Sequence, residues 1–240
     1  MGVPRLIRIM GLAGLLALAG CAATPPAHFY QLQQGSQALP KTGSGVAVLL
    51  GPLKLADYLQ RETLVQRQSD DSLVISQQAR WAGSLQDDVA QLLLRQLAGR
   101  LDSSRLALYP DRVGFKPEAQ LLLSISRLDS GPYQPAVLEA QWRLLDGQGT
   151  MRDSRVVRLQ EKHSGELGDQ VRAQSALLQT LAGQMANAVS GMARAAADES
   201  RPEAPSSRSG AKAAKPGKSE APRIPVVTPG ASPAAEVYRF

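Results

Sequence analysis

The chain of 240 residues contains a single cysteine, Cys21. One thiol excludes an internal disulfide framework and a zinc site built from cysteines. Cys21 comes after the most apolar stretch of the sequence, which runs from Ile9 to Ala19 and is followed by Gly20. A lone thiol at this position could serve redox or nucleophilic chemistry. The residues before Cys21 indicate which of these applies.

Residues 1–20 have the three parts of a secretory signal peptide. Arg5 and Arg8 supply the positive start, the apolar run follows, and small residues come last. The run is shorter than the roughly 20 apolar residues that a transmembrane helix needs. We therefore exclude residues 1–20 from the fold.

The four residues Leu18-Ala19-Gly20-Cys21 are similar to the lipobox of bacterial lipoproteins. The resemblance implies transfer of diacylglycerol to the Cys21 sulfur, cleavage between Gly20 and Cys21, and acylation of the new amine. Two or more acyl chains hold a protein stably on a bilayer, at about 0.8 kcal/mol per buried CH₂. In enteric bacteria, an Asp directly after the lipidated cysteine retains a lipoprotein in the inner membrane. By resemblance to this rule, Ala22 at that position favours the periplasmic face of the outer membrane. The alternative is an ordinary secretory signal with a chance cysteine.

The other reactive side chains form no catalytic or metal-binding pattern. Neither His28 nor His163 has a second ligand at metal-binding spacing. Asp87 and Asp88 are adjacent carboxylates, but acids in the first turn of a helix complement its dipole, and we interpret them in that way. No serine-nucleophile elbow and no phosphate-binding loop occur. The sequence thus predicts a protein that is not an enzyme, with no metal and no cofactor besides a covalent lipid.

The net charge of +6 is not carried by the central part of the chain. Residues 1–20 contribute +2 and residues 201–240 contribute +4, so residues 22–200 are neutral. A nucleic-acid-binding domain needs its own basic face. We therefore predict no nucleic-acid partner.

Two segments have the apolar spacing of amphipathic helices, residues 84–101 and about 169–197. Ser84 can cap the first, with Asp87 three residues later. Asp146-Gly147 marks a hairpin turn, and residues 69–72 mark another. We predict an α+β two-layer sandwich, in which two long helices cover one face of a mainly antiparallel sheet. A sheet that mixes parallel and antiparallel strands is the alternative. The predicted strands cover residues 29–32, 46–55, 63–68, 73–76, 105–110, 119–128, 137–146 and 151–163.

The chain divides by composition into four parts. A signal peptide at 1–20 precedes a Pro-rich tether at 21–28, and residues 29–198 form the domain. Residues 199–240 are rich in Pro, Ala and Lys, cannot bury a core and are predicted to be disordered.

From Cys21 to about residue 195, the sequence resembles the auxiliary lipoproteins of ABC-type transport systems, the PqiC/YmbA type. The resemblance implies a non-catalytic lipoprotein whose partner is an MCE-domain protein, working with an inner-membrane permease and an ATPase. The cargo would be lipid or another hydrophobic molecule, and a homo-oligomer is left open. The long Pro-rich tail departs from the family pattern. The motifs that carry the resemblance are the lipobox, His28 to Leu32, Gly51-Pro52, Tyr58-Leu59, Arg61 to Val65 and Arg80-Trp81.

A candidate partner interface consists of Tyr58, Arg61, Arg80 and Trp81, because aromatic and Arg side chains are enriched at interface hot spots. The alternative is that Tyr58 and Trp81 only cap the core.

At the level of function, a second hypothesis is a structural or assembly lipoprotein, a pilot or plug for an outer-membrane machine. A third is a hydrolase on a lipid tether.

Overall fold

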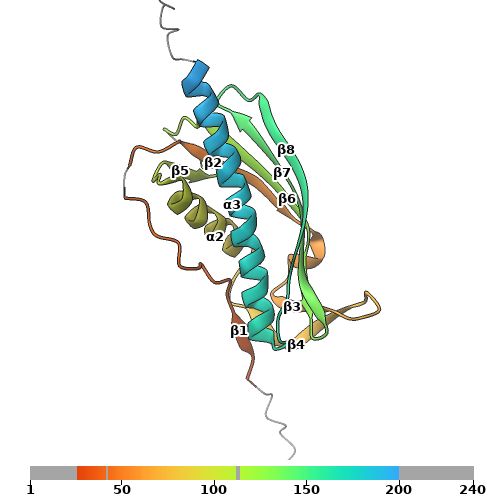
Figure 1. Ribbon diagram of the computed structural model, residues 1–240. Coiled ribbons are helices and arrows are strands. Elements are labelled where there is room, and N and C mark those ends of the chain that lie inside the picture. Colours follow the sequence, from red (N-terminus) through yellow and green to blue (C-terminus); the bar gives the residue numbers. More distant parts are fainter. Residues whose placement is uncertain (1–25, 42, 112–113, 200–240) are drawn as a thin grey trace, which may run out of the picture. The chain divides into compact units, whose positions relative to one another are not determined.

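The computed structural model describes residues 26–41, 43–111 and 114–199. In these residues eight strands, two α-helices and one 3-10 helix, η1, follow one another (Figure 1). Cys21, Gly20 and the predicted tail from residue 200 lie outside the described residues. The elements are β1 (His28–Tyr30), β2 (Val48–Leu55), η1 (Asp57–Leu59), β3 (Thr63–Arg67), β4 (Leu73–Trp81), α2 (Leu85–Leu101), β5 (Leu106–Leu108), β6 (Ala119–Gly131), β7 (Gln134–Asp146), β8 (Met151–Glu161) and α3 (Leu167–Glu199).

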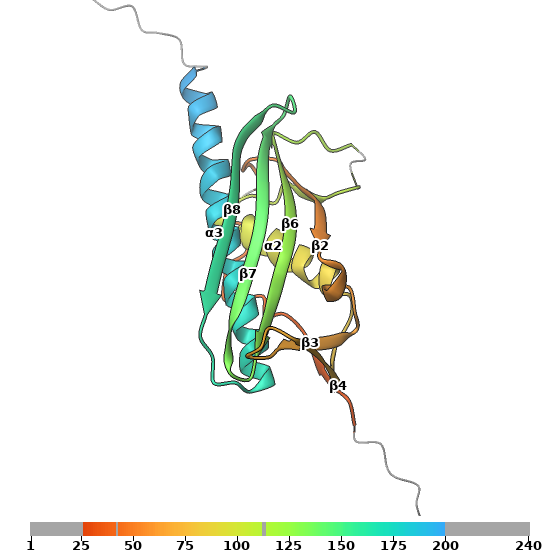
Figure 2. The ribbon, with the colours of Figure 1, turned by 90° about the vertical axis from the view of Figure 1, so that its right-hand side faces the viewer.

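The two helices cover one face of the sheet. Figure 2 shows β2, β6, β7 and β8 in front and both helices behind them. α3 packs along β6, β7 and β8, while α2 lies against β2 and β5. The Ser84 hydroxyl caps α2 by accepting a hydrogen bond from the Asp87 backbone N–H at 3.3 Å. The predicted α+β arrangement with two helices on one face is confirmed.

The sheet is mixed and centres on β6. β2 and β3 pair in parallel with successive parts of one edge of β6, and β7 pairs antiparallel with the other edge. β8 continues the antiparallel side, and in the described part of the chain it pairs with β7 alone. β4 pairs antiparallel with β3, while β1 and β5 join in parallel at opposite ends of the strand order. β6 therefore connects the antiparallel hairpins to the parallel pairings.

The core lies between the helices and the sheet and is made mainly of Leu, Val and Ala. Side chains alternate along β7: Leu138, Ala140, Trp142 and Leu144 are buried, while Gln141 and Arg143 on the other face are exposed. The largest fully buried side chains are Trp142, Leu49, Leu50, Leu92, Leu93, Leu97, Leu121, Ile125, Leu128, Leu138, Leu144 and Leu178.

Most strand boundaries differ from the prediction, and the largest difference is at β4, which continues to Trp81 instead of ending at Ser76. β1 begins at His28 and ends at Tyr30, because its partner β4 ends at Trp81, opposite Tyr30. β6 continues to Gly131 and β7 begins at Gln134, so the β6–β7 turn is tighter than predicted. The extension includes two buried polar residues, Asp129 and Ser130. Asp and Ser are common in turns, so the sequence pattern predicted the end of the strand before them.

α3 is longer than predicted by two residues at each end. Its first turns are joined to the sheet by buried polar side chains: the Gln174 amide donates to the Ser130 hydroxyl at 2.9 Å, and that hydroxyl donates to the Gln170 side chain at 3.1 Å. Although α3 has 33 residues, neither it nor any other helix in the described part of the chain is apolar enough over a sufficient length to cross a membrane.

At Gly131 the backbone of β6 lies close to the backbone of β3. A Cβ atom at this position would lie 1.8 Å from the Arg67 carbonyl oxygen. Because backbone atoms must shift to relieve such a contact, Gly131→Ala is expected to lower the free energy of unfolding by about 1–3 kcal/mol. Urea denaturation measures the difference. The matched control is Gly191→Ala in α3, where no atom lies within 4 Å of the added methyl group, and helix propensity predicts equal or slightly higher stability. Equal effects of the two substitutions would contradict the close approach.

Candidate partner interface

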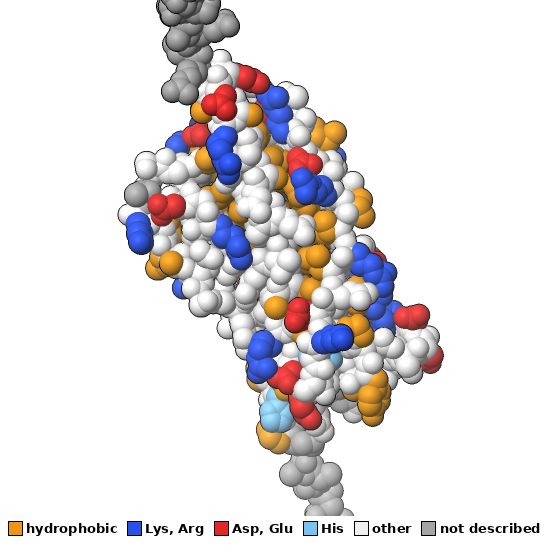
Figure 3. All heavy atoms as spheres, viewed as in Figure 1, with side chains coloured by type: hydrophobic (Ala, Val, Ile, Leu, Met, Phe, Trp, Pro, Cys, Tyr) orange, Lys and Arg blue, Asp and Glu red, His pale blue; other side chains and the backbone are white. Residues whose placement is uncertain are grey.

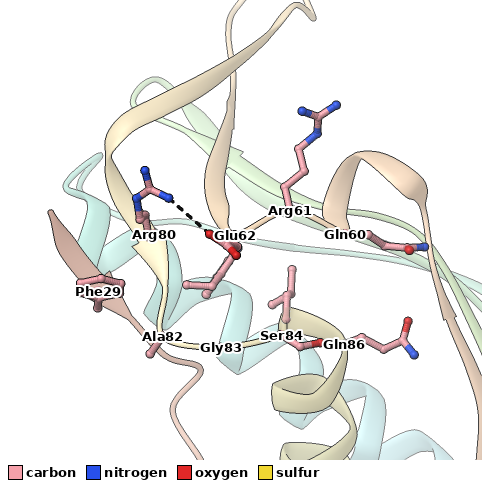
Figure 4. Close-up of a pocket in the computed structure, with 11 residues that line it drawn as sticks. Phe29, Gln60, Arg61, Glu62, Arg80, Ala82, Gly83, Ser84 and Gln86 are labelled. Atoms are coloured by element: carbon pink, nitrogen blue, oxygen red, sulfur yellow. Dashed lines mark hydrogen bonds and ion pairs between the residues drawn. The ribbon is translucent and has the colours of Figure 1, made fainter.

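A groove lies where β1, β4 and the start of α2 meet. Its volume is about 620 Å³, and its walls come from β1, from the segment between η1 and β3, and from the connection between β4 and α2. Figure 4 shows the polar residues at its rim. The lining residues are Phe29, Gln60, Arg61, Glu62, Arg80, Trp81, Ala82, Gly83, Ser84, Leu85 and Gln86.

Strand pairing brings these distant segments together. The parallel β1–β4 register sets Phe29 opposite Arg80, and the antiparallel β3–β4 register sets Thr63 opposite Arg80. The Trp81 backbone N–H donates to the Glu62 carbonyl oxygen at 2.7 Å, which fixes the segment before β3 against the end of β4. The Trp81 side chain is buried against the core.

The groove carries both charge and apolar surface. Arg80 Nη1 lies 3.4 Å from Glu62 Oε2, in an exposed ion pair that contributes little stability by itself. Phe29, which lines the groove from β1, is 65% exposed. The Arg61 guanidinium points away from the Ala82–Ser84 segment (Figure 4). Exposed Arg and aromatic side chains around a hollow are the types that dominate binding energy in protein interfaces.

The groove offers binding chemistry more readily than catalysis. Neither His28 nor His163 is among its lining residues. Within the described residues, no group of three or more His, Cys, Asp or Glu side chains is placed to hold a metal ion. Asp88, one of the adjacent carboxylates on α2, instead accepts a hydrogen bond from the Gln31 amide at 3.2 Å.

Tyr58 belongs to a different cluster, which surrounds the fully buried Asp129 carboxylate. Arg67 donates to both carboxylate oxygens, from Nε at 3.0 Å and from Nη2 at 2.7 Å. Arg127 Nε donates at 2.9 Å, and the Tyr58 hydroxyl donates at 2.8 Å. The four residues come from η1, β3 and β6, so this cluster joins three elements.

The electrostatics of the cluster follow from its burial and its hydrogen bonds. Burial alone would raise the pKa of Asp129, but hydrogen bonds from Arg67, Tyr58 and Arg127 outweigh that cost and hold the pKa below its ordinary value. Burial and the neighbouring Asp129 charge raise the pKa of the Tyr58 hydroxyl. Asp129 is therefore ionised and Tyr58 is protonated at neutral pH.

The structure thus brings three of the four sequence candidates to one place. Arg61, Arg80 and Trp81 line the groove, whereas Tyr58 does not and is held by Asp129. Trp81 is both part of the core and part of the groove lining. Sequence reasoning did not select Phe29. Phe29 reaches the groove only through the parallel β1–β4 pairing, and no local pattern reveals such a pairing.

The comparison with known families gives one match. A model of the ABC-type transport auxiliary lipoprotein component matches residues 30–186, which is more than half of the chain. The chain belongs to this family. The predicted resemblance is therefore confirmed for the family, and both the groove and the Asp129 cluster lie almost entirely within the matched region of this auxiliary lipoprotein.

Solved structures with the same fold support the architecture. One is an uncharacterized protein with a TM-score of 0.55 and 19% identity, covering 68% of this chain and 99% of its own. Another is a protein from Xanthomonas campestris of the family DUF330, with a TM-score of 0.55 and 14% identity, covering 70% of this chain and 99% of its own. At these identities the likeness concerns the fold alone. No curated protein matches the auxiliary lipoprotein significantly.

Proposed function

We propose that this auxiliary lipoprotein is an outer-membrane-anchored, non-catalytic component of an ABC-type transport system that moves lipids or other hydrophobic molecules. Its partner is an MCE-domain protein, which works with an inner-membrane permease and an ATPase. The family match over residues 30–186 is the observation that carries this proposal. The lipobox at Cys21 and the following Ala22 support anchoring on the periplasmic face of the outer membrane.

The groove is the proposed docking site for the partner. Arg61, Arg80 and Glu62 give it a net charge of +1. A partner segment that carries an acidic residue fits this charge, since complementary charge aids specificity.

Crosslinking in cells tests the partner. A photoreactive amino acid at Gln86, in the groove, is expected to capture an MCE-domain protein, while the same group at Gln148, in the β7–β8 turn, captures none. Recovery of only an outer-membrane barrel or a secretin from position 86 would favour the assembly hypothesis instead. A hydrolase activity that disappears on substitution of one polar residue, with folding intact, would contradict a non-catalytic role.

The charge of the groove gives a separate prediction. The double substitution Arg61→Ala with Arg80→Ala is expected to weaken partner binding by tenfold or more, because interface arginines commonly contribute more than about 1 kcal/mol each. Capture at position 86 and a pull-down titration measure the loss. The matched control replaces Arg95 and Arg194, two exposed arginines on α2 and α3, with alanine. If both double variants bind equally well, the groove is not the docking site.

A further inference from the structure

Exposed apolar side chains gather at one end of the domain. Five of the nine large apolar side chains exposed in the described residues belong to β1, to the β3–β4 hairpin or to the β6–β7 turn. We call the part of the domain formed by these three elements the basal end. Figure 3 shows hydrophobic side chains at the lower end of the view, where β1 and the β6–β7 turn lie. The five residues are Phe29, Leu73, Val74, Ile75 and Tyr133.

Backbone pairing fixes these elements beside one another. β1 pairs with β4, β4 pairs with β3, and Gln66 of β3 pairs with Ser130, next to the β6–β7 turn. Phe29 and Tyr133 are the two most exposed aromatic side chains of the group, at 65% and 88%. At these exposures, neither side chain is part of the core of the described domain.

The sequence places the proposed lipid anchor at the same end. Cys21 precedes His28, the first residue of β1, by seven residues. A chain of that length spans at most about 25 Å when fully extended. A lipid on Cys21 therefore keeps β1 close to the membrane surface, whereas the β7–β8 turn lies at the other end of β7, about 40 Å away at the rise of a β-strand.

We infer that the basal end rests on the bilayer to which the chain is anchored, with Phe29 and Tyr133 among the lipid headgroups. This inference rests on the anchor in the proposed function. Aromatic side chains concentrate at membrane interfaces, and the Tyr133 hydroxyl can stay hydrated while its ring enters the apolar boundary. Contact at two points besides the lipid fixes the orientation of the domain, which a flexible tether alone does not.

Charge at the basal end limits how deep it enters. Asp70 and Asp71 lie in the β3–β4 turn, and the Ser72 backbone and hydroxyl donate to Asp70 Oδ1 at 3.0 and 2.7 Å. These hydrogen bonds hold the pKa of Asp70 below its ordinary value, so the turn remains charged. The hairpin tip accordingly stays in the aqueous headgroup layer, because charged groups are costly in hydrocarbon.

Quenching of a fluorescent label by nitroxide-headgroup lipid tests the orientation. The lipidated full chain is placed in vesicles of phosphatidylethanolamine and phosphatidylglycerol, with a label at Lys162→Cys or at Gln148→Cys. Position 162 follows Glu161, which pairs with Ala136 near the β6–β7 turn, and position 148 lies at the opposite end of the same hairpin. We expect quenching several-fold stronger at 162. In Phe29→Ser with Tyr133→Ser, the two labels should be quenched equally.

The control variant is Leu39→Ser with Val156→Ser, which removes apolar side chains of comparable exposure, 64% and 81%, from other parts of the domain. It should leave the difference between the labels unchanged. Protein that floats with the vesicles but shows equal quenching at both positions overturns the inference and leaves the anchor intact. Self-association that Phe29→Ser with Tyr133→Ser abolishes, together with equal quenching, assigns the basal end to a second copy instead. Failure of the full chain to float overturns the anchor and this inference together.

Discussion

Replacement of Asp129 with alanine is expected to lower the free energy of unfolding by about 3–5 kcal/mol, the usual cost of removing one partner from a buried ion pair. The substitution leaves the largely buried Arg67 and Arg127 guanidinium groups without their shared counter-ion, and it leaves the Tyr58 hydroxyl without its acceptor. Because typical domains are stable by only about 5–15 kcal/mol, this is a large part of the total. Urea denaturation followed by circular dichroism measures it.

The same carboxylate gives the protein a dependence on pH. The pKa of Asp129 is lower in the folded chain than in the unfolded chain, where it is about 3.9. Its contribution is therefore fully present above about pH 5 and is lost as the pH falls below 3.9 toward the folded value. We expect the difference in unfolding free energy between the wild type and Asp129→Asn to shrink over that range.

A surface pair supplies the comparison for Asp129. Arg105 and Glu118 lie 2.9 Å apart with both side chains about half exposed, so Glu118→Ala should cost less than about 1 kcal/mol. An equally small effect of Asp129→Ala, or a difference from Asp129→Asn that does not change with pH, would show that the cluster does not hold η1, β3 and β6 together.

The second large effect concerns Cys21, whose substitution by serine is expected to abolish acylation completely. A hydroxyl does not replace the thiol that receives the diacylglyceryl group in the lipobox reaction. Labelling of cells with a clickable palmitate analogue, followed by gel analysis of the captured protein, measures the loss. Substitution of Ala22 by serine keeps the thiol and should keep the label.

Release from the membrane needs a second form of the chain, because an uncleaved signal peptide is itself apolar. Residues 1–20 are exchanged for a conventional secretory signal, and Cys21 is replaced by serine. Without two or more acyl chains, stable anchoring is lost, and we expect the protein in the soluble periplasmic fraction. Persistent association with the outer membrane would contradict the lipid anchor as the main attachment.

The local parts of the fold were predictable from the sequence. The apolar face of α2, the Ser84 cap and the alternation along β7 each appear within one short window. The β3–β4 and β7–β8 hairpins were also predictable, because polar turn residues separate adjacent strands. Such features depend on residues that are close in sequence, which is where periodicity and turn chemistry give information.

The non-local parts were not predictable. β1 pairs with β4 across about fifty residues, and nothing in the His28–Tyr30 segment specifies that partner. Asp129 and Ser130 have the composition of a turn but lie buried in β6, because Arg67 and Gln170 supply hydrogen-bond partners from distant segments. The candidate site was also predicted only in part, because one of its residues depends on a non-local pairing. Arg61, Arg80 and Trp81 could be selected by residue type, whereas Phe29 reaches the groove only through the pairing of β1 with β4.

Among the described residues, the layer formed by β1, β4 and β3 has a single backbone pairing with the rest of the sheet, Gln66 with Ser130, and the Arg67–Asp129 ion pair is a further link to β6. A layer joined in this way can open as a unit while β6, β7 and β8 stay paired, and such units open at lower free energy than the whole domain. The groove lies between this layer and the start of α2. A partner that binds only the closed layer therefore also suppresses its opening, by thermodynamic linkage. Partner docking and the local folding of this layer are consequently coupled equilibria, so that a change in one shifts the other.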